Sequence, residues 1–165
     1  TDGFYALRED VGKFYAAAAV CGLCDVLLYE NIVNEELFLR AVAALKEMCE
    51  GNEAPALVSF FLRALELSGY ALAPLVCADC GEPLGAGACF DVADGCFTCA
   101  ACARGAGVSE STLAVLAACT GADAPEGSAY SAEGELRAVK LLYAFFRAKT
   151  DARVRAVEEW LQLPR

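Results

Sequence analysis

Six of the ten cysteines lie in one short segment, residues 75–102, LVCADCGEPLGAGACFDVADGCFTCAAC. Cys77 and Cys80 form one Cys-x-x-Cys pair, and Cys99 and Cys102 form a second, with eighteen residues between the two pairs. Two such turns can place four thiolates at the corners of a tetrahedron, with Zn–S distances of about 2.3 Å. Because four thiolates leave no coordination position open, the predicted Zn²⁺, one per chain, is structural and would not activate water.

Two other cysteines of the segment compete for these ligand positions. Cys96 stands three residues before Cys99 and could form another Cys-x-x-Cys pair, and Cys89 lies between the two pairs. We expect both to be bystanders, although either could replace one of the four ligands. A disulfide framework is the competing interpretation, but it is typical of secreted chains, and no signal peptide opens this sequence.

The remaining four cysteines are expected to be ordinary apolar residues. Cys21 and Cys24 have the spacing of a redox motif, yet CGLC lies in a long apolar helical pattern with no strand before it. Cys49 and Cys119 fall on apolar helix faces. The sequence therefore predicts small core residues at these positions.

Composition argues against several classes of function. The chain has no histidine, which removes the commonest general base and the usual ligand of catalytic zinc. No phosphate-binding glycine motif is present either, so no small-molecule substrate is predicted. These absences remove the easiest routes to catalysis without excluding an enzyme. The net charge of −10 argues against a uniformly basic nucleic-acid-binding protein.

Positive charge is nevertheless concentrated near the end of the sequence. Six of the thirteen basic residues lie between positions 137 and 155, where the only acid is Asp151: Arg137, Lys140, Arg147, Lys149, Arg153 and Arg155. Such a cluster creates a local field that the net charge conceals, and it predicts a DNA-contacting surface. The alternative is a solvated helix face opposite an apolar stripe.

The elements that must position these residues are mainly helical. The 165 residues suit a single helical domain over 1–165, a bundle of about six helices, with an inserted four-cysteine zinc-finger loop over 75–108 that holds only short β pieces, and a loop over 120–130. Uncharged runs such as 14–24 and 111–122 are too short to cross a membrane, so no membrane association is expected. The chain begins at Thr1 rather than Met, which suggests a trimmed chain or a fragment.

Apolar periodicity and capping residues predict where the helices lie. The six predicted helices are a first over 7–29, a second capped by Asn34 and stopped by Gly51, a third with Pro55 in its first turn and Gly69 as terminator, a fourth from Ser109 to about Cys119, a fifth from Ser131, and a sixth from Thr150 or Asp151 to about Leu161. The predicted inward face of the second helix comprises Phe38, Ala41, Val42, Leu45, Met48 and Cys49, and that of the third comprises Leu57, Phe60, Phe61, Ala64 and Leu65.

Several stretches resemble the bacterial RecO family. SFFLRALELSGYALAPLVCADCGEPL resembles the segment that leads into the zinc knuckle of that family. GCFTCAAC followed by VSESTLAVL resembles the second Cys-x-x-Cys pair and the helix after it. REDVGKFYAAAAVCGLCDVLLYENIVNEELFLRAVAALKEM and the closing YAFFRAKTDARVRAVEEWLQL also fit, so the resemblance covers nearly the whole chain.

This resemblance implies a mediator of DNA repair and homologous recombination. Members of the family bind single- and double-stranded DNA and, with RecR, help to load RecA onto strands coated by single-strand-binding protein. They are not enzymes, and they act in the cytoplasm at the nucleoid. Members also carry an N-terminal OB-fold, which nothing here resembles, so this chain is expected to be the C-terminal helical and zinc-binding region.

Two other functions stay open on the sequence. CADCGEPLG also resembles the opening of the zinc finger of GTPase-activating proteins for Arf GTPases. Those proteins require an arginine in an Ile-x-Cys-Ser-Gly-x-His-Arg context, whereas here Cys102 is followed by ARGAGVS with Arg104 at a different offset. The second alternative is a zinc-stapled protein-interaction scaffold that does not bind DNA.

Overall fold

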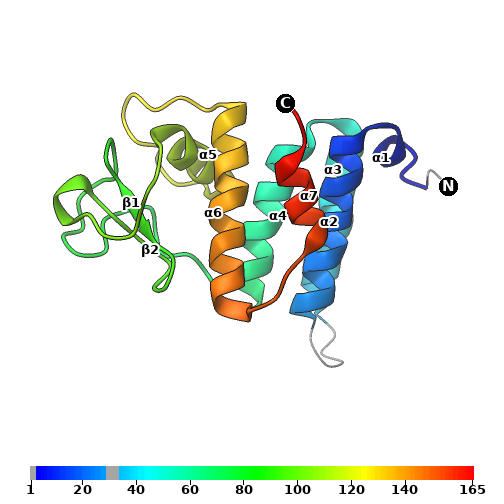
Figure 1. Cartoon of the computed structure of the whole chain (residues 1–165), viewed down its shortest axis with the longest axis horizontal. Coiled ribbons are helices and arrows are strands. Elements are labelled where there is room, and N and C mark those ends of the chain that lie inside the picture. The colour runs from blue at the N-terminus through cyan, green and yellow to red at the C-terminus, as the bar shows by residue number, and fades with distance from the viewer. Residues whose placement is uncertain (1–2, 29–33) are drawn as a thin grey trace.

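The computed structural model describes residues 3–28 and 34–165, which form seven α-helices and one small antiparallel sheet (Figure 1). The helices are α1 (Ala6–Glu9), α2 (Val11–Leu27), α3 (Glu35–Glu50), α4 (Glu53–Leu67), α5 (Glu110–Thr120), α6 (Ala132–Thr150) and α7 (Arg155–Gln162). The strands are β1 (Cys89–Asp91), β2 (Cys96–Thr98) and β3 (Ala106–Gly107), and a 3₁₀ helix covers Ala100–Cys102. The predicted class, a mainly helical bundle with short β pieces in a cysteine-rich loop, is confirmed.

Capping side chains fix the starts of most helices. The side chain of Asn34 accepts a hydrogen bond from the N–H of Leu37 (2.9 Å), and Ser131 accepts one from Gly134 (3.0 Å). Ser109 does the same for Thr112 at the start of α5. Each side-chain oxygen satisfies an amide that the first helical turn leaves unpaired. The starts predicted from these three residues are confirmed.

The first predicted helix is wrong in one respect, because Asp10 divides it into α1 and α2. Asp10 adopts an extended conformation (φ −124°, ψ 128°), and its side chain accepts a hydrogen bond from the N–H of Lys13 at 2.9 Å. Aspartate favours this capping role over a place inside a helix, although the apolar spacing continues through it. The predicted end at Tyr29 lies outside the described residues.

The start predicted for the last helix, Thr150 or Asp151, is also wrong. Asp151 adopts a left-handed conformation (φ 54°), and its N–H bonds to the carbonyl of Arg147, so it ends α6. Residues 151–154 then run outside any helix, and α7 begins at Arg155. After this connection α7 turns back and packs on α2.

Helix α4 lies in the middle of the bundle and packs against α2, α3, α5 and α6. Its predicted inward residues are all buried, and Phe61 makes an edge-to-face contact with Phe146 of α6 at a centroid distance of 5.9 Å. The helical core is therefore built around α4.

Gly22 permits the close approach of α2 to the segment before α7, because a Cβ there would lie 2.6 Å from a methyl group of Val154.

The inward face predicted for the second helix was partly wrong. Phe38 is 62% exposed, whereas its neighbour Leu37 is completely buried. The buried residues of α3 are Leu37, Ala41, Ala44 and Met48. These spacings of four, three and four follow the helical repeat, and the large ring of Phe38 falls just outside that stripe.

The sheet lies at one end of the molecule, beside α6 (Figure 1). The strand order is β2-β1-β3, and both pairings are antiparallel, with Phe90 opposite Phe97 and Cys89 opposite Gly107. The rings of Phe90 and Phe97 lie 4.8 Å apart, and Phe90 contacts Phe145 of α6 edge-to-face at 5.9 Å. These three rings join the cysteine-rich loop, residues 75–108, to the helical bundle; we call this loop the knuckle.

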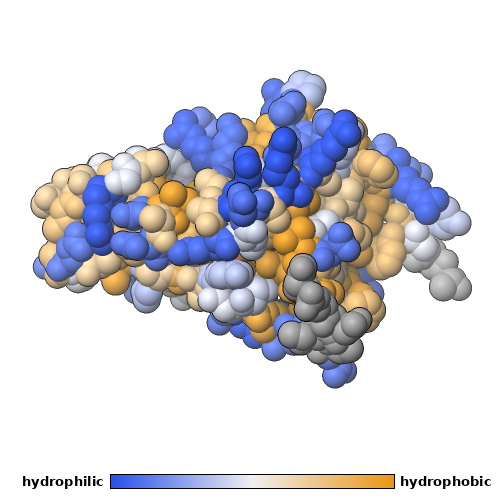
Figure 2. Space-filling view, turned by 60° about the horizontal axis from the view of Figure 1, so that its bottom comes forward, coloured by the Kyte–Doolittle hydropathy of each residue, from blue (hydrophilic) through white to orange (hydrophobic). Residues whose placement is uncertain are grey.

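The surface of the two parts differs. On the face shown in Figure 2, strongly hydrophilic side chains gather over the helical part, and moderately hydrophobic residues cover much of the knuckle end. Within the described ranges, no helix combines the length and the apolar character that a membrane span requires.

Candidate metal centre

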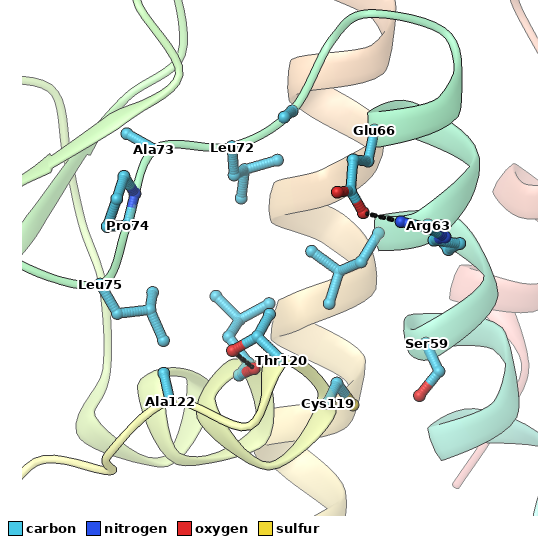
Figure 3. Close-up of a pocket in the computed structure, with 13 residues that line it drawn as sticks. Ser59, Arg63, Glu66, Leu72, Ala73, Pro74, Leu75, Cys119, Thr120 and Ala122 are labelled. Carbon is cyan, nitrogen blue, oxygen red and sulfur yellow. Dashed lines mark hydrogen bonds and ion pairs between the residues drawn. The ribbon is translucent and has the colours of Figure 1, made fainter.

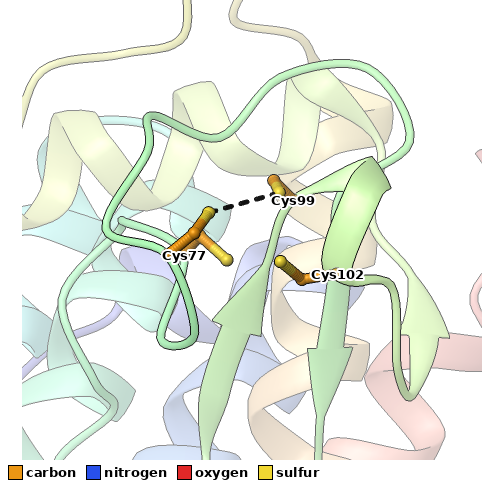
Figure 4. Close-up of side chains that lie close together, drawn as sticks. Cys77, Cys99 and Cys102 are labelled. Carbon is orange, nitrogen blue, oxygen red and sulfur yellow. Dashed lines mark hydrogen bonds between the residues drawn. The ribbon is translucent and has the colours of Figure 1, made fainter.

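Four cysteines converge in the knuckle from its two ends (Figure 4). The Sγ atoms of Cys77, Cys80, Cys99 and Cys102 all lie within 4.8 Å of one another. These are the four residues that the sequence predicts as ligands, and the structure brings all four together. The cluster includes neither Cys89 nor Cys96.

Backbone hydrogen bonds shape the two turns that carry these thiols. In the first turn the N–H of Gly81 bonds to the carbonyl of Cys77 at 2.9 Å, and Gly81 has a positive φ of 77° that favours glycine. In the second, the N–H of Cys102 bonds to the carbonyl of Cys99 at 3.1 Å within the 3₁₀ helix. A bond from the N–H of Ala78 to the carbonyl of Phe97 (2.8 Å) joins the first turn to β2.

The donor set and its dimensions fit a tetrahedral metal ion. The Sγ atoms of Cys80 and Cys99 lie 3.7 Å apart, and both residues are free cysteines. A disulfide requires a separation of about 2.0 Å, whereas four sulfurs at about 2.3 Å from a common ion stand roughly 3.8 Å apart. The four thiols could therefore hold a metal ion, and their chemistry suits a soft or borderline ion.

The thiols of this cluster differ in their affinity for a proton. The backbone N–H of Cys99, helped by those of Cys80 and Asp79, lowers the pKa of Cys77 to about 6. The neighbouring side chains of Cys80, Cys99 and Cys77 raise the pKa of Cys102 to about 12. Without a cation the cluster therefore retains protons that a bound divalent ion would displace.

The other two cysteines of the knuckle lie in the sheet. Cys89 is half-buried, and its thiol donates to the carbonyl of Gly87 at 3.8 Å. Cys96 is buried, and its Sγ lies 3.4 Å from Nη2 of Arg104.

The four cysteines outside the knuckle differ in how far they are exposed to solvent. Cys24, Cys49 and Cys119 are partly buried, but Cys21 is exposed on α2, so its assignment to the core was wrong. Burial, and then the nearby Cys21, raise the pKa of Cys24 to about 11, so Cys24 is a neutral thiol at neutral pH.

The six basic residues near the end of the chain lie on α6 and around the start of α7. Three of the arginines form ion pairs with nearby glutamates: Arg137 with Glu133, Arg153 with Glu158 and Arg155 with Glu159. Lys149 donates to the carbonyl of Ala93 at 2.6 Å, in the turn between β1 and β2. Lys140 and Arg147 are exposed, and within the described part of the chain neither forms an ion pair.

Arg104 was not predicted from the sequence to have a role at the metal centre. The structure places this residue next to the knuckle turns, with Nη2 3.1 Å from Oδ1 of Asp79. The signal that could have found it is the charge pattern, because an aspartate stands between the first two ligands and an arginine follows the last ligand by two positions.

A cavity of about 450 Å³ lies between α4, α5 and residues 71–75 (Figure 3). Its charged groups, Arg63 and Glu66, pair with each other at 2.6 Å. Burial raises the pKa of Cys119, which lines the same cavity. At neutral pH this thiol is protonated and a poor nucleophile, so the cavity offers no activated sulfur for chemistry.

Comparison with known proteins points to one family. The family model described as "Recombination protein O C terminal" matches residues 8–157. The chain is 38% identical over 105 residues to the DNA repair protein RecO of Anaeromyxobacter sp. (strain K) and 36% identical to that of Anaeromyxobacter dehalogenans (strain 2CP-C). Each match covers 62% of this chain and 41% of the relative. No solved structure matches the chain.

The family match extends over both the helices and the knuckle. The chain spans about two fifths of the length of the curated relatives that it matches. The resemblance to the RecO family is confirmed by a match that includes all four clustered cysteines. The chain therefore belongs to the RecO family, in the region described as its C terminal part.

Proposed function

We propose that this chain is the helical and zinc-binding part of a mediator of DNA repair and homologous recombination. The observation that carries the proposal is the family match over residues 8–157. The matched relatives are named DNA repair protein RecO. As the resemblance implies, the longer protein would bind single- and double-stranded DNA and help RecR to load RecA where single-strand-binding protein covers a strand. It would act in the cytoplasm at the nucleoid, without catalysing bond breakage.

In this proposal the ion at the knuckle is a structural Zn²⁺ held by Cys77, Cys80, Cys99 and Cys102. Four thiolate ligands are typical of structural zinc sites, and they leave no position for water or substrate. Bound zinc would supply folding free energy rather than chemistry, because it joins two turns that are far apart along the chain. The separation of 3.7 Å between the Sγ atoms of Cys80 and Cys99 supports this role.

The proposed DNA-contacting surface is the basic cluster of Arg137, Lys140, Arg147, Lys149, Arg153 and Arg155. Such residues would contact phosphates without reading the sequence. Lys140 and Arg147 are exposed, and they lie on the same face of α6, seven residues apart. Because other residues of the cluster also serve ion pairs, we expect Lys140 and Arg147 to contribute most to phosphate contact.

DNA titrations test this function. The chain alone, with its charge of −10, is expected to bind a single-stranded oligonucleotide no more tightly than a non-specific protein, with a Kd of roughly 10⁻⁴–10⁻⁶ M. In the longer protein that contains this chain, changing Arg147, Lys149, Arg153 and Arg155 to Glu should weaken DNA binding and flatten its salt dependence. Zinc content and helical circular dichroism should stay as in the unchanged protein.

The net charge favours one competing function, a zinc-stapled protein-interaction scaffold without DNA binding. Unchanged DNA affinity and unchanged salt dependence in the charge-reversed protein would support that scaffold and exclude Arg147, Lys149, Arg153 and Arg155 as DNA contacts. A pull-down with single-stranded DNA and RecR as baits separates the two functions directly, because the scaffold would not be retained by the DNA.

A further inference from the structure

We propose that Arg104 is a positioning residue for the metal centre, whose guanidinium joins the two halves of the knuckle and slows the loss of the bound ion. This inference rests on the proposed zinc site. It adds a residue that binds no metal itself and that acts through two aspartates.

The first contact ties Arg104 to the turn of the first cysteine pair. Nη2 of Arg104 lies 3.1 Å from Oδ1 of Asp79, and Asp79 stands between Cys77 and Cys80. Arg104 itself follows the last cysteine, Cys102, by two residues. A single ion pair therefore spans the two turns that carry the thiols.

The same guanidinium also reaches the turn between β1 and β2. Its Nη1 lies 3.8 Å from Oδ2 of Asp94, and its Nη2 lies 3.4 Å from Sγ of Cys96. Asp94 and Cys96 come directly before the second cysteine pair along the chain. Arg104 thus contacts both the turn of the first cysteine pair and the residues that lead into the second pair.

The backbone of Arg104 is held in place by a buried side chain. Its N–H donates to Oγ1 of Thr98 (3.3 Å), and the hydroxyl of Thr98 donates to its carbonyl (3.4 Å). Thr98 is completely buried in β2. The next residue, Gly105, has a φ of +87° and packs so closely on the carbonyl of Phe90 that a Cβ would lie 2.2 Å from it. Because the backbone on both sides of Arg104 is held in place, less conformational entropy is lost when its side chain pairs with the aspartates.

The negative charge around the metal centre explains why an arginine at position 104 would stabilise it. Four thiolates around a divalent cation carry a net charge of −2, and Asp79 and Asp94 add further negative charge nearby. Because the N–H groups of a guanidinium form a rigid fork, Arg104 can donate a hydrogen bond to Asp79 and form an ion pair with Asp94 at the same time. Arg104 therefore offsets repulsion at the place where the two turns meet.

Screening by solvent limits how much the ion pair of Arg104 can slow the release of zinc. The side chains of Arg104 and Asp79 are both 43% exposed, and exposed ion pairs contribute little on their own. Residues that support metal ligands typically change metal affinity by roughly 10–100-fold. We expect the lower end of that range, a release of zinc about tenfold faster in Arg104→Ala.

The test measures how fast the zinc-loaded chain releases its ion to an excess of a coloured chelator, at about 0.05 M and about 0.5 M salt, since salt screens exposed charges. Arg104→Ala should release zinc faster at low salt and show little further acceleration at high salt. Arg104→Lys should restore part of the wild-type rate, and Asp79→Asn should resemble Arg104→Ala. Arg40→Ala, which removes an exposed arginine paired with Glu36 on α3, is the matched control and should release zinc at the wild-type rate.

Each outcome decides between the possibilities. If Arg104→Ala and Asp79→Asn both keep the wild-type rate and salt dependence, the inference is overturned while the zinc site stands. If Arg104→Ala takes up no zinc at all, Asp79→Asn decides: faster, salt-insensitive release supports the inference, and wild-type release overturns it. If the unchanged chain itself contains no metal, the proposed zinc site fails, a result that the zinc content shows before any release is measured.

Discussion

Two Cys-x-x-Cys motifs of this chain have opposite chemical environments. Around Cys77, backbone N–H groups point at the sulfur and lower its pKa to about 6, with that of Cys99 contributing most. Around Cys24, in the middle of α2, burial raises the pKa to about 11. Within a helix the backbone N–H groups are already bonded to carbonyls, so they cannot turn toward a thiolate. The same spacing therefore makes a ligand pair in a turn and two ordinary thiols in a helix.

This difference predicts the effect of removing single thiols. Cys80→Ala should abolish stoichiometric zinc binding, because three thiolates cannot close the site and structural zinc contributes roughly 10–16 kcal/mol of apparent binding energy in small zinc-binding peptides. Cys21→Ala removes an equally exposed thiol from the other motif and should keep one zinc per chain. Elemental analysis of the two purified variants measures this, and zinc retained by Cys80→Ala would show that another group completes the site.

A buried hydroxyl connects the last two helices. The hydroxyl of Tyr143 on α6 accepts a hydrogen bond from the N–H of Val154 at 3.0 Å and donates to Oε1 of Glu158 on α7 at 2.9 Å. Val154 belongs to the segment between the helices, where its amide has no helical carbonyl to bond. Tyr143 thus fixes the turn that returns α7 to α2.

We expect Tyr143→Phe to lower the free energy of unfolding by about 1–3 kcal/mol, because the change leaves the buried N–H of Val154 without a partner. Urea denaturation followed by circular dichroism gives this value. Tyr5→Phe removes a hydroxyl from an exposed ring and should leave stability within about 0.5 kcal/mol of the wild type. Equal stability of Tyr143→Phe and wild type would mean that water replaces the hydroxyl.

Glu158 makes the same junction sensitive to acid. Hydrogen bonds from Arg153 and then Tyr143 lower the pKa of its carboxyl group. A lowered pKa in the folded state adds stability that is fully present above the ordinary glutamate pKa of about 4.3 and is lost as the pH falls through the folded value. Thermal unfolding of wild type and Glu158→Gln should therefore differ at pH 6 and converge toward pH 3. A constant difference across this range would contradict the argument.

Some features of the helices and of the knuckle can be predicted from the sequence, and others cannot. Polar caps such as Ser109 and Ser131 act within three residues, so their helices are predictable, and the four clustered cysteines are predictable because their spacing is a property of the metal site. Phe38 was misplaced because its face of α3 depends on how α2 and α4 pack against that helix. Asp151 was misread as a helix start because its left-handed backbone conformation serves the return of α7, a contact distant along the chain. Arg104 was missed for the same reason, since its partner Asp79 lies 25 positions away.

At the scale of the whole molecule, the knuckle and the helical bundle share one apolar core but differ in how much of it each contributes. The bundle buries α4 among four helices, whereas the knuckle has few strand residues and depends on the rings of Phe90, Phe97 and Phe145 and on the clustered thiols. Small units without a large core commonly need a metal to fold.

Removing zinc with a chelator should therefore loosen the knuckle and leave the bundle folded. Amide hydrogen exchange is expected to accelerate between residues 77 and 102, while α2 and α4 keep their protection. Helical circular dichroism serves as the control and should change little. Loss of protection throughout α4 on chelation would show that the two parts fold as one unit.

The position of the thiols also bears on how the chain is made. All four lie between residues 77 and 102, so the complete set of clustered thiols is synthesised before α6 and α7. The metal can then be captured early, because closing such a short loop costs little entropy. The ring of Phe145, however, arrives later, and until it packs on Phe90 the apolar side of the newly formed knuckle stays open to water. During that interval the four thiols could already hold an ion while the apolar side of the knuckle is exposed, and this side is the surface that a chaperone would have to shield.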